Sequence, residues 1–137
     1  MIIEALRAIL LETATVTDLV GDRIYPVTAP DAPSYPFLVL TKAAGVGQYD
    51  MAGDAGIEPA RIQVDCHVDD GASACITLKT AVRRKLSGFK GGASGFPCQV
   101  DAMFCINDFD LTEPATERAG PRVRRRTLEF TCWHKEI

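Results

Sequence analysis

The residues Arg61-Ile62-Gln63-Val64-Asp65-Cys66-His67-Val68 carry the clearest structural signal in the chain. Polar and apolar side chains alternate along this segment without a break, which is the period of a β-strand. Such alternation indicates one buried and one wet face, as in an antiparallel sheet covered on one side. The side chains predicted to point inward are Ile62, Val64, Cys66 and Val68.

Two amphipathic helices are predicted on either side of this strand in the sequence. The first spans residues 2–12, where apolar residues recur at helical spacing and charged residues stay off that stripe. The second spans residues 72–87 and carries cations in its last turn, where they favour the negative end of the helix dipole. Thr15 and Asp18 match a capping box and predict a short additional helix that ends near Gly21.

Three further strands are predicted, over residues 37–42, 98–107 and 122–134. The last one is cationic at its start and is expected to lie outside the core until Leu128. The inward-facing side chains of the last two strands are predicted to be Val100, Phe104, Leu128 and Phe130. The chain is therefore expected to be one α+β domain over residues 1–137, with a four-stranded, mostly antiparallel sheet and two main helices packed on one face.

Composition indicates a folded protein of ordinary globular character. The 137 residues are 47% hydrophobic and 24% charged, and the formal net charge of −3 argues against a general nucleic-acid binder. Five cysteines, an odd number without a C-x-x-C spacing, favour free thiols in a reducing cytosol. The N-terminal segment lacks the features of a signal peptide, and no apolar run is long enough to predict a membrane span.

A search for chemistry yields no catalytic or metal-binding constellation. Cys66 and His67 are neighbours on a strand and so point to opposite faces, while Cys132 and His134 share a face but lack further ligands at a recognisable spacing. No cysteine is placed where its thiolate would be stabilised, and no glycine-rich loop is followed by a helix that could cradle a phosphate. We therefore expect no enzyme, no metal and no cofactor.

Charge is distributed unevenly along the chain. Residues 1–60 carry eight acids and three bases, a balance of −5, whereas residues 61–137 carry ten acids and twelve bases, a balance of +2. Residues 43–59 contain four glycines and three acids but no base, and loops of this length are usually functional or mobile. We expect this loop to order against a partner or a neighbouring subunit.

The densest basic tract is Arg122, Arg124, Arg125 and Arg126, and it has two interpretations. It suits the phosphates of a nucleic acid, which makes a nucleic-acid-binding module the alternative function. However, four acids precede it in residues 108–117, and no aromatic residues interleave with the arginines to stack bases. A contact between protomers explains the tract at least as well, since arginine is favoured at interfaces.

In order and spacing, the motifs of the whole chain resemble the tail-completion family of tailed bacteriophages. The matching segments are Val16–Pro26, Tyr35–Leu40, Ala60–Cys66, the helix at residues 72–88, Asp110–Pro114 and the closing Trp133-His134. The cysteine content and the connection KGGASG at residues 90–95 have no place in that pattern.

The resemblance implies a structural tail terminator, or head–tail joining protein, without catalytic residues. Such proteins form a ring, commonly a hexamer, that caps the tail tube and receives the neck of the head. The implied partners are further copies of the chain, the tail tube protein and the head–neck connector or stopper protein, with no membrane and no direct specific nucleic-acid binding. Gene transfer agents use the same fold, so the implied location is the tail or neck of a virion or virus-like particle assembled in the bacterial cytoplasm.

A closed ring joins two different patches of each protomer, and opposite charges suggest which patches these are. We expect the arginine tract to meet an acidic loop of the next copy, and reversal of Arg124 and Arg126 to glutamate to weaken the ring without unfolding the monomer. The predicted subunit or partner contacts are Gln48, Tyr49, Asp50, Asp54, Glu58, Asp108, Asp110, Glu113, Arg122, Arg124, Arg125 and Arg126. A small-molecule or enzymatic domain of similar fold remains a further alternative, which an apolar pocket with convergent polar groups would support.

Overall fold

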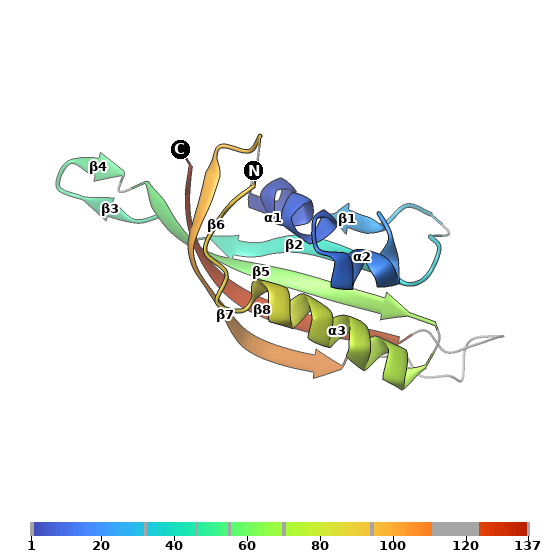
Figure 1. The fold of residues 1–137 in the computed structure, drawn as a ribbon. Coiled ribbons are helices and arrows are strands. Elements are labelled where there is room, and N and C mark those ends of the chain that lie inside the picture. The colour runs from blue at the N-terminus through green and yellow to red at the C-terminus, as the bar shows by residue number, and fades with distance from the viewer. Residues whose placement is uncertain are drawn as a thin grey trace.

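The computed structural model describes residues 2–31, 33–45, 47–54, 56–69, 71–93, 95–110 and 124–136. Figure 1 shows how the helices and strands are arranged within these ranges. The helices are α1 (Ile2–Leu11), α2 (Ala14–Val20) and α3 (Ala72–Leu86). The strands are β1 (Ile24–Pro26), β2 (Phe37–Gly45), β3 (Tyr49–Asp50), β4 (Gly53–Asp54), β5 (Ile57–Val68), β6 (Gly91–Gly92), β7 (Cys98–Asp110) and β8 (Arg124–Glu136).

Among the described residues the main sheet has six strands in the order β1-β2-β5-β8-β7-β6, and β3 and β4 form a separate pair. The prediction of a four-stranded sheet was therefore wrong, although the class is still α+β. The sheet is mixed, because β1 runs parallel to β2 while the other neighbours are antiparallel. It is also strongly curved, and α1, α2 and α3 lie on one side of it (Figure 1).

The two strands of the main sheet that the prediction missed are short edge strands. Three residues form β1, which ends at Pro26, a position where the missing backbone N–H disturbs no ladder. Two glycines form β6, which is too short to show an alternating pattern. The short helix that ends near Gly21 was predicted, and it is α2; its capping box was misplaced, because Thr13 is the N-cap and Thr15 lies inside the helix.

One apolar cluster fills the space between the helices and the concave side of the sheet. It contains the inward-facing residues predicted for the strand at 61–68, which are fully buried or nearly so: Ile62, Val64, Cys66 and Val68. Val100, Leu128 and Phe130 are buried as predicted as well. The helices α1 and α3 run close to their predicted ranges and place their apolar stripes in this cluster.

Phe104 was predicted to point inward, and that prediction was wrong, because its side chain is 56% exposed. The cause is a shift of register in β7 between Val100 and Ala102, where one extra residue enters the strand. A β-bulge of this kind reverses the facing of the side chains that follow it, up to the next bulge in the strand. Met103, opposite Cys132, is buried in the place that Phe104 was expected to occupy.

The face of the sheet that points away from the helices is only partly wet. Phe37 on β2 stacks on His67 of β5, with ring centroids 4.6 Å apart and planes 8° from parallel. Tyr25 and Tyr35 pack around the same phenylalanine at 5.9 and 5.2 Å. Asp65, expected on the wet face, is only 5% exposed. The register of β5 is nevertheless as predicted, because Arg61 is exposed and Gln63 only partly covered.

Candidate assembly surfaces

The described part of the arginine tract lies inside the sheet. Arg124, Arg125 and Arg126 are the first residues of β8, and they pair in register with Val68, His67 and Cys66 of β5. The expectation that this strand stays outside the core until Leu128 was therefore wrong. Strand β8 pairs with β5 from its first residue and has β7 on its other side from Arg126, which lies opposite Asp110.

Arg125 points to the face away from the helices and is held by Asp65. Its Nη2 atom lies 3.2 Å from Oδ1 of Asp65, and its Nε donates to the same oxygen at 3.3 Å. The hydroxyl of Thr127 donates to that oxygen at 2.6 Å. The buried carboxylate thus has charged and neutral donors around it, as a buried charge requires.

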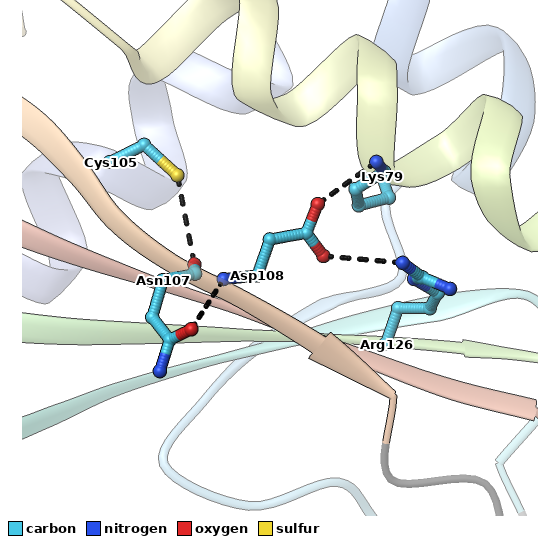
Figure 2. Close-up of polar contacts among 5 residues, drawn as sticks. All are labelled: Lys79, Cys105, Asn107, Asp108 and Arg126. Atoms are coloured by element: carbon cyan, nitrogen blue, oxygen red, sulfur yellow. Dashed lines mark hydrogen bonds and ion pairs between the residues drawn. The ribbon is translucent and has the colours of Figure 1, made fainter.

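Arg126 points to the opposite face, towards α3. Figure 2 shows Asp108 of β7 between two cations, with its Oδ2 3.0 Å from Nζ of Lys79 and its Oδ1 3.5 Å from Nη2 of Arg126. The three side chains are between 14% and 27% exposed, so the cluster is partly desolvated. It ties α3 to the two strands beneath it.

A second bulge in β7 is what brings Asp108 under α3. The register shifts between Cys105 and Asn107, so that Ile106 is an extra residue and Asp108 pairs with Leu128 on the helix side. The backbone N–H of Asp108 donates to the side chain of Asn107 at 3.0 Å, and the thiol of Cys105 contacts the Asn107 carbonyl at 3.7 Å (Figure 2). These local contacts support the irregular segment from which the acid projects.

The segment between β2 and β5 forms a projecting hairpin. Strands β3 and β4 extend well beyond the sheet and the helices (Figure 1). The large apolar side chains of this hairpin are exposed to solvent: Tyr49 is 76% exposed and Met51 is fully exposed. The backbone N–H of Ala52 donates to Oδ1 of Asp50 at 2.8 Å, which forms the tight turn at the tip.

The base of this hairpin is held by charge. Glu58 on β5 forms an ion pair with Lys42 at the end of β2, and its carboxylate lies 4.0 Å from Nε2 of His134 on β8. The Nδ1 atom of His134 is 3.7 Å from Sγ of Cys98. Both His134 and Cys98 are buried, and His134 also lines a cavity of about 430 Å³ together with Glu58 and Lys42.

Burial also decides the chemistry of the other cysteines. Desolvation raises the pKa of the Cys132 thiol to about 12, and it raises the pKa values of Cys66 and Cys75 as well. Such thiols stay protonated at neutral pH and are poor nucleophiles. Cys105 is the partly exposed one of the five.

The chain matches the family model described as "Tail completion protein gp17" over residues 4–135. It belongs to the tail completion protein gp17 family. This confirms the resemblance seen in the sequence and identifies the chain as a structural component of a phage-type tail, and hence of a virion. Among curated proteins, none matches the chain significantly in sequence.

A similar solved structure is a chain described as "Virion of native gene transfer agent (GTA) particle". It superposes with a TM-score of 0.72 at 18% sequence identity, covering 97% of this tail completion chain and 93% of the other. At that identity the likeness shows a shared fold. The two chains correspond over nearly their whole lengths.

The predicted contact residues of this tail completion chain fall into four groups. Gln48, Tyr49, Asp50 and Asp54 belong to the hairpin, where Tyr49 and Asp50 are exposed. Glu58, Asp108, Arg125 and Arg126 have ion-pair partners within the chain. Arg124 is the first residue of β8, and Asp110 is the last residue of β7. Glu113 and Arg122 lie outside the described residues.

Sequence reasoning missed two exposed apolar positions. Met51 lies in the glycine-rich segment, where Gln48, Tyr49 and the acids were predicted contacts but Met51 was not. Ile76 lies on α3 off the apolar stripe. Both are large apolar side chains at positions that the pattern assigns to solvent, and that mismatch was the available signal. Ile76 contributes to a groove between α2 and α3.

The described residues contain no group of three His, Cys, Asp or Glu side chains arranged to hold a metal ion. Over the same part of the chain, no helix has both the length and the apolar character needed to cross a membrane.

Proposed function

We propose that this tail completion protein is a tail terminator that forms a ring, caps the tail tube and joins it to the head–neck connector. The observation that carries the proposal is the family match over residues 4–135. The similar chain from a gene transfer agent virion supports the same assignment, because its fold corresponds to this one over almost the full length. A ring of six subunits is the state expected from the resemblance.

The surface supports an assembly role better than a catalytic one. Tyr49 and Met51 are presented on a hairpin far from the core, and such exposed apolar groups on a soluble surface mark contact sites. The charge difference between the two halves of the chain provides complementary fields for self-association. These features suit a contact with a copy of the chain or with the tail tube protein.

The nucleic-acid alternative has lost part of its basis. Arg125 and Arg126 are paired with Asp65 and Asp108 on opposite faces of the sheet, so they do not present one continuous basic stripe. A phosphate-binding surface needs several cations facing the same backbone, and its affinity would fall steeply with salt. DNA affinity with a strong salt dependence would restore this alternative.

Light scattering tests the proposed function directly. The molar mass of the protein should be measured alone and with the tail tube protein, over a range of concentrations. A ring predicts a discrete multiple of the 14.8 kDa chain mass, alone or once the tube is added. A monomer under every condition, with no binding to the tube, would overturn the proposal.

A further inference from the structure

A groove runs between α2 and α3 on the helix-covered side of the molecule. Its volume is about 750 Å³, and Leu19, Ile76 and Ala81 contribute apolar surface to it. Ile76 is 46% exposed although it lies on a helix that packs against the sheet. An apolar side chain of another protein molecule would be removed from water if it packed against this half-exposed isoleucine, which stabilises the contact.

The rim of the groove is cationic at one end. Arg84 and Lys85, in the last turn of α3, line it together with Asp18 of α2. Arg84 is exposed, and Lys85 extends over the ring of Phe89 with its Nζ 5.5 Å from the centroid. The groove therefore combines an apolar floor with two positive charges against a single acid.

The projecting hairpin has the complementary composition. Tyr49 and Met51 are its exposed apolar groups, and Asp50 lies exposed between them. No lysine or arginine occurs from residue 43 to residue 59. Methionine adapts its shape to irregular surfaces, and tyrosine offers a large contact area at low entropic cost, so both suit a docking tip.

The hairpin of one chain does not meet the groove of the same chain. Figure 1 shows the hairpin projecting to one side of the sheet, away from α2 and α3. A contact between hairpin and groove therefore joins two copies head to tail and leaves each copy with one unused partner surface. A closed ring satisfies every such surface.

We propose that the tip of the β3–β4 hairpin docks in the α2–α3 groove of the next copy of the chain. Tyr49 and Met51 contact the apolar floor near Ile76, and Asp50 faces Arg84 and Lys85. This inference rests on the proposed ring and names the contact that builds it.

The outer edge of β7 is the rival acceptor. Residues 101–110 lie beyond the short pairing with β6, and Phe104 and Ile106 are exposed along that strand. However, Asp101 and Asp110 lie on the same strand. An acidic hairpin approaching this edge meets like charge, whereas the groove rim offers two cations.

Cysteine cross-linking tests the contact between copies. Met51→Cys and Ile76→Cys proteins are mixed, oxidised and analysed on a non-reducing gel, with the unmodified protein as background for the native thiols. We expect a cross-linked dimer in the mixture that neither variant forms alone. Phe104→Cys mixed with Met51→Cys is the matched competitor, and a cross-link there instead of at position 76 would overturn the groove assignment.

Charge exchange provides a second test by light scattering. Arg84→Glu should raise the dissociation constant of the ring contact on the order of tenfold, and Asp50→Lys in the same chain should recover much of it. Arg83→Glu is the matched control, because Arg83 is an exposed arginine of the same helical turn that does not line the groove.

The outcomes separate the two proposals. The groove contact is rejected if Arg83→Glu and Arg84→Glu weaken self-association equally, or if neither weakens it while the ring persists. Both of these outcomes leave the proposal of a ring standing. A wild-type protein that stays monomeric with and without the tail tube protein rejects the ring itself.

Discussion

Asp65 is a buried acid whose removal is expected to destabilise the fold. It is almost fully buried on the face away from the helices, and Arg125, Thr127 and Gln63 donate to it. Removing a carboxylate in such a position leaves its donors unsatisfied, which costs more than the pair itself contributes.

We expect Asp65→Ala to lower the free energy of unfolding by about 2–3 kcal/mol. The loss of stability is no larger than this because Arg125 is about one-third exposed and regains some hydration once the carboxylate is removed. Thr127→Val should cost less, about 1 kcal/mol, since it removes one neutral donor. Urea unfolding followed by circular dichroism measures both changes. Asp69→Ala, at an exposed position, is the control, and an equal loss there would contradict this role for Asp65.

The buried Cys132 thiol lowers the stability of the protein at alkaline pH. Its pKa is raised from 9.0 to about 12 by burial, so above pH 9 the unfolded chain releases a proton that the native state retains. Stability is therefore full below about pH 9 and falls as pH rises towards 12. The loss from this one group is about 1.4 kcal/mol per pH unit within that window.

Cys132→Ala isolates this contribution. The variant is expected to be less stable than the parent at pH 8, because a buried group has been removed. The difference should shrink by about 2–3 kcal/mol between pH 8 and pH 11. Urea unfolding at these pH values measures it, and a constant difference across the range would show that the thiol does not titrate as stated.

Strand β7 carries two bulges, and these control which of its side chains reach the helices. Between them, Met103 and Cys105 face inward, and beyond the second one Asp108 does. The acid then meets Lys79 and Arg126 beneath α3. The arginine tract thus contributes to the joint between helix and sheet, which is not the role that its composition predicted.

Arg126→Glu should destabilise the monomer by about 2–3 kcal/mol, because it places a second carboxylate beside Asp108 in a partly desolvated site. The earlier expectation of a charge reversal that spares the monomer does not apply to this residue. Urea unfolding at a protein concentration too low for assembly measures the effect. Arg61→Glu, at an exposed position of β5, should change stability by no more than about 0.5 kcal/mol. If the two variants are equally stable, the cluster in Figure 2 does not hold α3.

Regular patterns in the sequence predicted the elements that are regular in the structure. The strand at 61–68 and both long helices were predicted because burial repeats there with one fixed period. Phe104 was misplaced because a bulge adds one residue without leaving a mark in an alternating pattern. The β1 strand was missed because its three residues adjoin a proline-rich loop, which indicates irregular structure.

The candidate site was predictable only in part. The acidic, glycine-rich segment 43–59 was predicted to make contacts, and its hairpin is the most exposed feature described. The α2–α3 groove depends on the packing of two helices that are distant in sequence, so no local pattern indicates it. The ion pairs that occupy Arg125 and Arg126 likewise depend on the register of β8 against its neighbours.

Across the whole molecule, one apolar cluster joins the sheet to the helices, and the β3–β4 hairpin lies outside it. Replacing residues 47–56 with a short glycine-containing turn should therefore leave the unfolding free energy within about 0.5 kcal/mol of wild type. The same variant is expected to lose self-association, measured by light scattering. Wild-type assembly by the shortened protein would show that the segment is only a connector, and a large loss of stability would show that it belongs to the core.

The separation of the hairpin from the core has an evolutionary consequence. Substitutions at the core must preserve close packing, whereas those at Tyr49 and Met51 disturb no buried neighbour. Selection can therefore change what the protein attaches to while its folding stays under separate constraint. In a lineage that exchanges tail modules between particles, we expect the hairpin tip to diverge fastest and to change together with the surface that receives it.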